Sequence, residues 1–203
     1  MVITYHGDSC VRLTGKHAAG EFAVLIDLYD AKATGLKPLR PSSADLVIST
    51  TGEIPSFSEG PYLVRGPGEC EVRGVSVVGI PFHGRTIYRI VAEGISIAHL
   101  GNASTKLDAG TAELLGEVDI CFVPIGGNGV LGAKEAGETI EQLEPRIVIP
   151  IQYGVKGTKL PYDGPEAFCK EYGCSLKEVE DRLKIVEKDM PSDETWVRII
   201  AIS

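Results

Sequence analysis

The chain has 203 residues, 43% of them hydrophobic and 24% charged, which is typical of a globular protein long enough to bury its own core. Its net charge of −8 argues against binding to nucleic acids or anionic membranes, because both are negatively charged. No segment approaches the roughly 18 apolar residues of a membrane-spanning helix, and no charged stretch after Met1 leads into a long apolar run. We therefore expect a single domain over residues 1–203, located in the cytoplasm.

Short apolar runs separated by Gly and Pro fill the first half of the chain, a pattern typical of strands joined by tight connections. The expected strands cover residues 2–5, 10–15, 22–28, 45–50, 62–66 and 74–82. Residues 86–100 predict a hairpin, because two β-branched runs flank Ala92-Glu93-Gly94.

The second half alternates predicted helices and strands. Helices are expected at 105–116 and at 132–145, where Ala133, Ala136, Ile140 and Leu143 share one face. The runs 118–127 and 146–153 are apolar enough to be strands buried on both faces. Ser175 and Glu178 predict a capped helix over 175–183, and residues 195–203 predict a final strand. This order favours two sheets packed face to face with helices outside.

The five cysteines, at positions 10, 70, 121, 169 and 174, form no C-x-x-C motif. Cys121 lies inside the apolar run DICFVPI and is expected to be a core thiol. Cys169 and Cys174 are close enough in sequence to meet, but their spacing alone does not indicate a bond. We predict that all five are reduced thiols in a reducing compartment.

Several strings, in order along residues 2–164, resemble the metallo-β-lactamase fold. They include ITYHGDSCVRL, ADLVIST, GPGECEVRGVSVVGIPFHG, GISIAHLGN and AKEAGETIEQLEPRIVIPIQY. The chain is most similar to small bacterial Zn-dependent hydrolases that include ascorbate-6-phosphate lactonase-like proteins. This resemblance implies an α/β fold, a four-layer αββα sandwich of two mixed β-sheets, and a homo-oligomer.

The resemblance also implies that seven positions correspond to the metal ligands of that family: Thr51, Glu53, Pro55, Ser56, His83, Asn102 and Gln152. The first four stand where the family has His, His, Asp and His. Asn102 replaces a bridging Asp and Gln152 replaces the last His, so that only His83 keeps the residue that the family has at its position. Shifting the alignment restores nothing, because residues 44–60 contain no histidine.

These replacements weaken the expected chemistry. Zinc is held by imidazole nitrogens, thiolates and carboxylates, and an amide such as Asn102 or Gln152 supplies neither the charge nor the nitrogen. Without the ion, nothing lowers the pKa of water from about 15.7 to about 7. We therefore expect a metal-free, non-catalytic relative with no cofactor. It would act as a binding or assembly module, with room for a small-molecule ligand in the old cleft.

Three alternatives remain open. One is a hydrolase, lactonase or phosphodiesterase-like, with an altered metal site around His83. The second is a replacement metal site formed by His6, Asp8, Glu53 and His83. The third is a nucleophilic Cys10 activated by His6 or His83.

Overall fold

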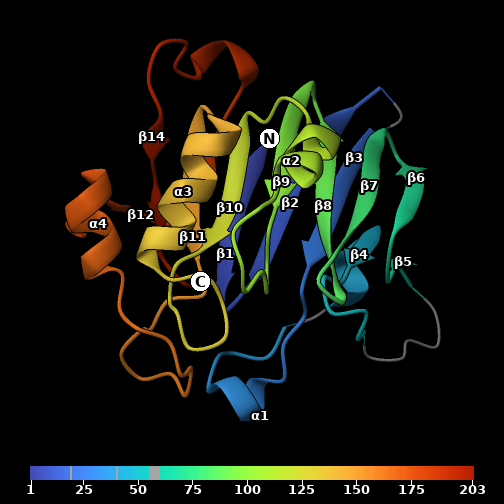
Figure 1. Cartoon of the computed structure of the whole chain (residues 1–203). Helices are drawn as coiled ribbons and strands as arrows, with labels where there is room; N and C mark the ends of the chain where they lie inside the picture. The colour runs from blue at the N-terminus through green and yellow to red at the C-terminus, as the bar shows by residue number, and fades with distance from the viewer. Residues whose placement is uncertain (19, 40, 55–59) are drawn as a thin grey trace.

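The computed structural model describes residues 1–18, 20–39, 41–54 and 60–203, and it contains two mixed β-sheets packed face to face (Figure 1). The six-stranded sheet has the spatial order β13 (Leu183–Lys184), β1 (Val2–Gly7), β2 (Cys10–His17), β3 (Gly20–Ile26), β4 (Leu46–Ile48) and β5 (Tyr62–Val64). The seven-stranded sheet has the order β14 (Trp196–Val197), β11 (Ile147–Ile151), β10 (Ile120–Pro124), β9 (Ile95–His99), β8 (Arg85–Ala92), β7 (Val75–Phe82) and β6 (Gly68–Val72). The predicted sandwich of two mixed sheets is confirmed.

Each sheet combines hairpins with a parallel block. Strands β3, β4 and β5 are mutually parallel, as are β9, β10, β11 and β14. The hairpins β1–β2, β2–β3, β6–β7, β7–β8 and β8–β9 are antiparallel. The expected hairpin over 86–100 is therefore present as β8 and β9.

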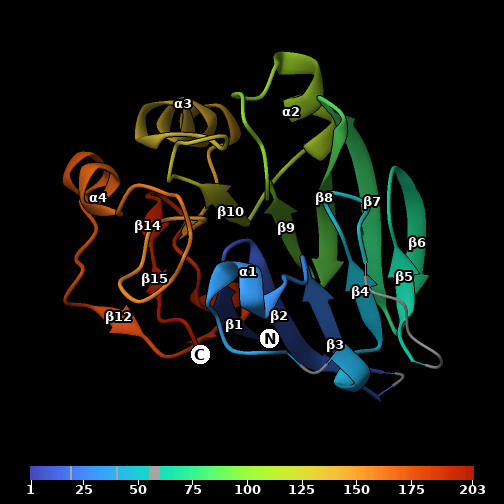
Figure 2. The same cartoon turned by 90° about the horizontal axis from the view of Figure 1, so that it is seen from below.

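The core lies between the sheets and beneath the helices of the seven-stranded sheet. Strands β9, β10 and β11 are buried at every position, because the other sheet covers one face and helices cover the other. These helices are α2 (Ala109–Leu115) and α3 (Ala133–Leu143), which Figure 2 shows on the outer side of that sheet. Strand β1 instead alternates between buried and half-buried residues, as a strand with one solvent-facing side does.

The outer side of the six-stranded sheet has a thinner cover. Residues 28–39 and 41–44 contain the short helix α1 (Ala31–Thr34) and the 3-10 turn η1 (Pro41–Ser43). Its Leu28 and Leu39 pack on Cys10, Leu25 and Val47 of the sheet. The fourth layer of the sandwich is thus a loop with little helix, and part of this sheet's outer face remains exposed.

The C-terminal region differs most from expectation. The predicted helix over 175–183 is wrong: only a turn at Ser175 forms, and it leads into the strands β12 (Val179–Glu180) and β13. Val179 pairs with Ile199 of β15 (Ile199–Ile200), and Leu183 pairs with Ile3. Pairing with these strands stabilises an extended conformation more than the predicted helix cap stabilises a helix. The expected strand at 195–203 is correspondingly divided into β14 and β15.

Two helices and two 3-10 turns were not foreseen: α1, α4 (Glu166–Tyr172), η1 and η2 (Glu187–Asp189). Helix α4 begins after Pro165 and ends at Gly173, whose φ of 70° suits glycine. The predicted helix at 132–145 is confirmed as α3. The one expected at 105–116 begins only at Ala109, where the Asp108 side chain accepts a hydrogen bond from the Thr111 amide.

The prediction of five reduced thiols is wrong for two of them. Cys169 and Cys174 form a disulfide that links α4 to the segment after it, because the left-handed turn at Gly173 brings their backbones together. Cys10, Cys70 and Cys121 are free thiols. Within the described residues, no helix is long and apolar enough to cross a membrane.

Candidate functional site

Polar side chains from several strand ends meet at one edge of the sandwich. We call the group the strand-end cluster, with the members Asp8, Ser9, Asp27, Thr50, Asn102, Gln152 and Tyr162. Asp27 and Thr50 come shortly after the parallel strands β3 and β4. Asn102 and Gln152 come shortly after the parallel strands β9 and β11. Carboxyl ends of parallel strands lie at the same edge of a sheet, and open α/β sheets bind ligands there.

Asp27 is the most deeply buried acid of the cluster, with only 6% of its surface exposed. Its Oδ1 accepts a hydrogen bond from the Thr50 amide at 2.7 Å, and its Oδ2 accepts one from the Thr50 hydroxyl at 2.7 Å. The Asn102 amide nitrogen lies 3.5 Å from Oδ2. Neutral donors therefore hold this carboxylate, and no ion pair to it is found in the described part of the chain.

Asp8 lies in the turn between β1 and β2 and is partly exposed. Its Oδ1 accepts hydrogen bonds from the Gln152 amide nitrogen and from the Tyr162 hydroxyl, both at 3.1 Å. Burial raises the pKa of the Asp8 carboxyl, the negative charge of Asp27 raises it further, and the two hydrogen bonds oppose this. Two acids thus lie close enough to repel each other.

The amides of Asn102 and Gln152 connect the two acids. The Asn102 backbone amide donates to Gln152 Oε1 at 2.9 Å, and Gln152 Nε2 donates to Asn102 Oδ1 at 3.1 Å. Asn102 Nδ2 also donates to the Thr50 hydroxyl at 2.9 Å. Gln152 is completely buried, so its polar atoms need these partners. The structure therefore brings together two of the seven predicted positions.

The backbone of the cluster is unusual. Asp8, Asp27, Asn102 and Gln152 all have left-handed φ angles, of 55°, 52°, 61° and 50°, and His83 has 46°. Such conformations cost roughly 1–3 kcal/mol each and are concentrated at functional sites, although Asn and Asp tolerate them better than Gln or His. Five of the nine non-glycine residues with positive φ among the described residues are thus cluster members or predicted ligand positions.

The loop after β4 supplies less than the resemblance suggested. The Thr51 hydroxyl lies 3.1 Å from the Ser49 hydroxyl and accepts a bond from the Glu53 amide at 3.3 Å. These contacts shape the loop itself. Pro55 and Ser56 lie outside the described residues.

His83 occupies the turn between β7 and β8 and is exposed. Its ring packs edge-on against Phe82. The hairpin is tied to the cluster by the Thr86 amide, which donates to the Thr50 carbonyl at 2.9 Å. His83 therefore belongs to a turn beside the cluster, and no contact joins its ring to the cluster among the described residues.

A buried histidine, His99, holds the backbone next to two members of the cluster. The ring of His99 is fully buried, with Nε2 3.0 Å from the Ser9 carbonyl and Nδ1 accepting from the Gly101 amide at 3.2 Å. Burial lowers its pKa, so the ring is neutral and carries its proton on Nε2. A Cβ at Gly101 would press on this ring and on Asp27. His99 thus fixes the turn that carries Asp8.

Two of the sequence alternatives find no support. No group of three or more His, Cys, Asp and Glu side chains that could hold a metal exists within the described residues, so His6, Asp8, Glu53 and His83 do not form one. His6 contacts the Ser203 hydroxyl at 2.8 Å. Cys10 is fully buried, which raises its thiol pKa well above the usual value and leaves it unreactive.

The donors of the cluster decide which metal would suit it. Zinc sites in proteins are built from imidazole nitrogens, thiolates and carboxylates, and the cluster has neither an available imidazole nor a thiolate. It offers carboxylate, amide and hydroxyl oxygens, which are the ligands of Mg²⁺, Ca²⁺ and Mn²⁺. The residues present therefore do not fit a zinc site of the histidine type, but by donor chemistry they fit an oxygen-preferring cation.

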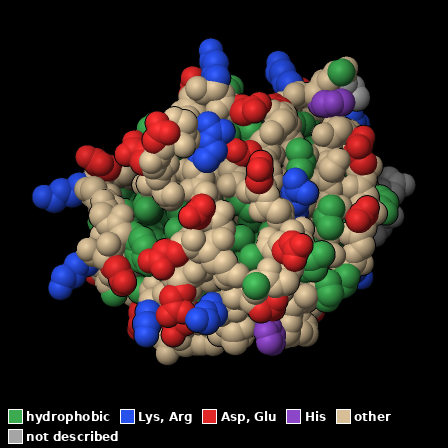
Figure 3. Space-filling model, turned by 45° about the horizontal axis from the view of Figure 1, so that its top comes forward, with side chains coloured by type: hydrophobic (Ala, Val, Ile, Leu, Met, Phe, Trp, Pro, Cys, Tyr) green, Lys and Arg blue, Asp and Glu red, His purple; other side chains and the backbone are tan. Residues whose placement is uncertain are grey.

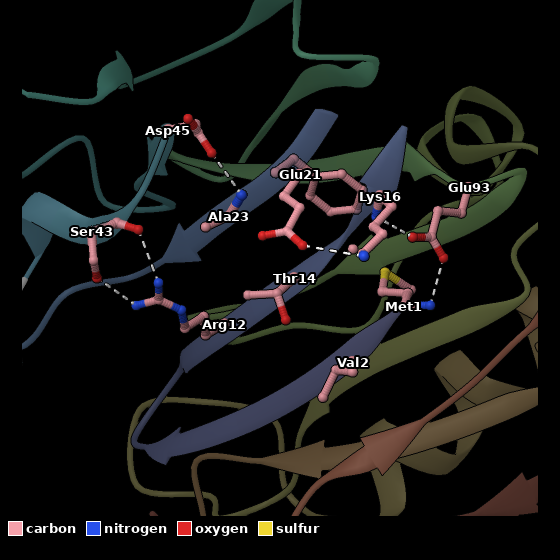
Figure 4. Close-up of a pocket in the computed structure, with 12 residues that line it drawn as sticks. Met1, Val2, Arg12, Thr14, Lys16, Glu21, Ala23, Ser43, Asp45 and Glu93 are labelled. Atoms are coloured by element: carbon pink, nitrogen blue, oxygen red, sulfur yellow. Dashed lines mark hydrogen bonds and ion pairs between the residues drawn. The ribbon is translucent and has the colours of Figure 1, made fainter. Parts of the chain in front are cut away.

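A separate hollow of about 580 Å³ lies on the solvent side of β1, β2 and β3 (Figure 4). Its charged groups are already paired. The Arg12 guanidinium donates to Ser43, and the Lys16 ammonium pairs with Glu21 at 3.3 Å. None of its lining residues belongs to the strand-end cluster, and we assign it no role.

Comparison with known proteins supports a hydrolase superfamily. Residues 2–152 match the beta-lactamase superfamily domain. A metal-dependent hydrolase of Thermococcus onnurineus is 35% identical over 98 residues, which cover 42% of this chain and 44% of that protein. One from Pyrococcus abyssi is 33% identical over 125 residues, covering 55% and 54%. The matches thus span about half the length of these relatives.

Among solved structures, a candidate Zn-dependent hydrolase of the metallo-beta-lactamase superfamily from Thermotoga maritima superposes with a TM-score of 0.80. It is 24% identical and covers 98% of both chains. Igni18, a metallo hydrolase from Ignicoccus hospitalis, has a TM-score of 0.57 at 14% identity, covering 85% and 90%. At these identities the likeness establishes the fold.

These relatives overturn two expectations. The prediction of a metal-free, non-catalytic relative is wrong, and so is the prediction of no cofactor, since the relatives are named metal-dependent hydrolases. The expectation rested on the seven ligand positions of the resemblance alone, and these do not include the two acids of the cluster. Asp27 and Tyr162, which sequence reasoning missed, are part of the same polar cluster. An acid directly after the buried run FAVLI was the signal for Asp27.

Proposed function

Because the chain belongs to the metallo-β-lactamase superfamily, we propose that it is a hydrolase whose reaction takes place at the strand-end cluster, with a divalent cation bound by oxygen ligands. The hydrolase alternative drawn from the sequence has its altered metal site around His83, and we place the site at the cluster that contains Asp8 and Asp27. The substrate class proposed is a lactone or a phosphodiester.

One observation carries the proposal. Asp8, Asp27, Asn102 and Gln152 hold left-handed backbone conformations at one edge of the sandwich, and two of them are acids without a cationic partner in the described residues. Strained backbone and repelling acids both reduce stability. A chain that needed only a stable scaffold would gain by losing the Asp8 charge, so the presence of this acid beside Asp27 supports a function.

The cluster's oxygens would hold the cation. Asp27, Asn102 Oδ1 and Gln152 Oε1 would be its ligands. Their side chains are already fixed by the bonds between Asn102 and Gln152 and by the bond from the Thr50 hydroxyl to Asp27. When bound, a divalent cation polarises a carbonyl or phosphoryl oxygen and lowers the pKa of water.

The other residues act on water and on protons. Asp8 has one oxygen held by Gln152 and Tyr162, which fixes the direction of its second oxygen. Burial raises its pKa, and a carboxylate with a raised pKa is a stronger base for a water proton. Tyr162 reaches the cluster from segment 154–164. This segment is held in place by the Gly154 amide, which donates to the Asp163 carbonyl at 2.8 Å.

The proposal is tested by hydrolysis assays. Purified protein would be treated with chelator and then supplied with Mg²⁺, Mn²⁺ or Zn²⁺ and a panel of lactones and phosphodiesters. We expect turnover with Mg²⁺ or Mn²⁺ and its loss in Asp8→Asn. Glu113→Gln, an exposed acid on α2, serves as the matched control and should retain full activity. Activity that survives both the chelator and Asp8→Asn would place the reaction elsewhere.

A further inference from the structure

Among the residues that the structure describes, no further strand pairs with the edge of the seven-stranded sheet opposite β6. Strand β14 is the last strand of the sheet and has β11 as its one neighbour. The C-terminal end of α4 lies outside β14, as Figures 1 and 2 both show. Between them run two hollows, of about 650 and 280 Å³, that share Tyr172, Thr195 and Val197. We call these two neighbouring hollows together the β14 groove.

The floor of the β14 groove is apolar and aromatic. Ile140 and Pro145 from the end of α3, Val197 of β14 and Tyr172 of α4 line it, with Trp196 beside them. Trp196, Val197 and Tyr172 are each only partly buried. The groove therefore leaves apolar side chains of an edge strand in contact with water, which edge strands usually avoid.

The rim of the groove is acidic. Four exposed carboxylates line it: Glu141, Glu144, Asp193 and Glu194. The face shown in Figure 3 carries many acidic side chains with hydrophobic ones exposed between them. The negative charges of Glu171 and Glu141 contribute to the raised pKa of Tyr172, after burial as the main cause. An occupant of the groove therefore meets a negative potential.

Two basic side chains, Arg146 and Arg198, also line the groove, and both are already engaged. The Arg146 guanidinium donates to the Pro191 carbonyl at 2.7 Å and the Met190 carbonyl at 3.0 Å, and it pairs with Asp119 at 3.2 Å. The Arg198 guanidinium stacks over the Trp196 ring, 4.6 Å from its centre. Neither cation neutralises the four rim acids.

We propose that the β14 groove binds an extended, lysine- or arginine-rich segment of a partner protein. An extended segment can add to an exposed sheet edge through main-chain hydrogen bonds, with alternate side chains entering the groove. Apolar residues of that segment would pack on Val197 and Tyr172, and basic residues between them would meet the rim carboxylates. Charge complementarity of this kind speeds association and selects the partner.

A second copy of this chain fits the groove poorly. A two-fold dimer built on the groove would place four carboxylates against the same four, and like charges at an interface cost several kcal/mol. The chain as a whole carries a net charge of −8, which adds to the repulsion. The partner is therefore of opposite charge.

The single tryptophan of the chain makes the test direct. Because Trp196 is the only tryptophan and lines the groove, tryptophan fluorescence excited where tyrosine does not absorb reports on this site alone. The probe is a peptide of alternating lysine and valine, titrated into the full chain at low ionic strength. We expect a saturable fluorescence change that weakens at least tenfold in high salt, and no change with the matching glutamate–valine peptide.

Variants separate the groove from the overall charge. Glu141→Gln, Glu144→Gln and Asp193→Asn together should weaken binding at least tenfold. Glu194 is kept because it accepts the Trp196 Nε1 hydrogen bond at 2.7 Å. The control triple, Glu69→Gln, Glu113→Gln and Glu117→Gln, removes the same charge from exposed positions on β6, α2 and the loop after α2.

The control triple should bind as the wild type does. Equal losses in both triples, or no fluorescence change with the basic peptide, would overturn the proposal. A dimer in sedimentation that dissociates only in the groove triple would overturn it in favour of a second copy.

Discussion

Removing the charge of Asp27 and removing that of Asp8 should change stability in opposite directions, although both acids belong to the strand-end cluster. Asp27→Asn preserves the shape of the side chain but replaces one acceptor oxygen by a donor. That donor would face the Thr50 hydroxyl, which already accepts from Asn102 Nδ2 at 2.9 Å. Asp8→Asn can keep both of its bonds on Oδ1 and removes a charge that burial disfavours.

The expected loss for Asp27→Asn follows from its bonds. Two contacts of 2.7 Å reach a carboxylate that is 6% exposed, and hydrogen bonds to charged groups contribute about 1.5–3 kcal/mol each. One such bond is lost and the other becomes neutral, so the free energy of unfolding should fall by about 2 kcal/mol. For a domain of this length, that lowers the melting temperature by about 4–8 °C. Asp8→Asn should raise it.

Urea denaturation at neutral pH, with a chelator present, measures both variants in the metal-free state. Far-ultraviolet circular dichroism and Trp196 fluorescence should give coincident transitions. The reasoning is refuted if both variants lose stability by a similar amount, because Asp8 would then be a structural acid like Asp27.

Three further predictions concern the cluster and its support. The folded pKa of Asp8 is raised above its ordinary 3.8. The free energy of unfolding of Asp8→Asn should therefore exceed that of the wild type most at neutral pH, above the folded pKa, and the difference should vanish below pH 3.8. A difference in stability that does not depend on pH would show that burial of the Asp8 charge is not its cause. Tyr162→Phe removes a bond that stabilises the Asp8 carboxylate, so the Asp8 pKa measured by carbon-13 NMR should rise further, and a fall would show that Tyr162 acts otherwise. Gly126→Ala should lower the free energy of unfolding by about 1–3 kcal/mol, because the added Cβ would clash with the Gln152 carbonyl and with Tyr162. The control Gly66→Ala has no atom within 4 Å of the added carbon and should leave the melting temperature nearly unchanged.

The elements with strong local patterns were predictable. Helix α3 places Ala136, Ile140 and Leu143 on its buried face, and this periodicity is visible in the sequence. Strands β10 and β11 are apolar at every position because both of their faces are covered. In each case the local pattern and the tertiary environment favour the same structure.

The C-terminal region was not predictable from local signals. Ser175 and Glu178 resemble a helix start, but Val179 and Leu183 gain more by pairing with Ile199 and Ile3, which lie far away in the sequence. A capping box contributes only about 1 kcal/mol, whereas burial of the Leu183 side chain contributes about 1.5–3 kcal/mol, and the strand pairing of Val179 and Leu183 adds main-chain hydrogen bonds.

The site was predictable in part. The resemblance placed Asn102 and Gln152 at ligand positions, and the structure brings them within hydrogen-bonding distance of each other. It gave no reason to combine them with Asp27 and Tyr162, which lie 75 and 60 residues from Asn102 in the sequence. Contacts of that range depend on how the two sheets pack, and the sequence pattern does not contain that information.

Binding of Mn²⁺ followed by electron paramagnetic resonance tests the central claim, that the strand-end cluster holds an oxygen-ligated cation. We predict one site per chain that is lost in Asp27→Asn. Asn102→Asp should bind at least tenfold more tightly because it adds a carboxylate at a left-handed position that Asp tolerates. The matched variant Asn128→Asp, also left-handed with a φ of 49° but outside the cluster, should not change the affinity. An absence of Mn²⁺ binding in both the wild type and Asn102→Asp would contradict the account.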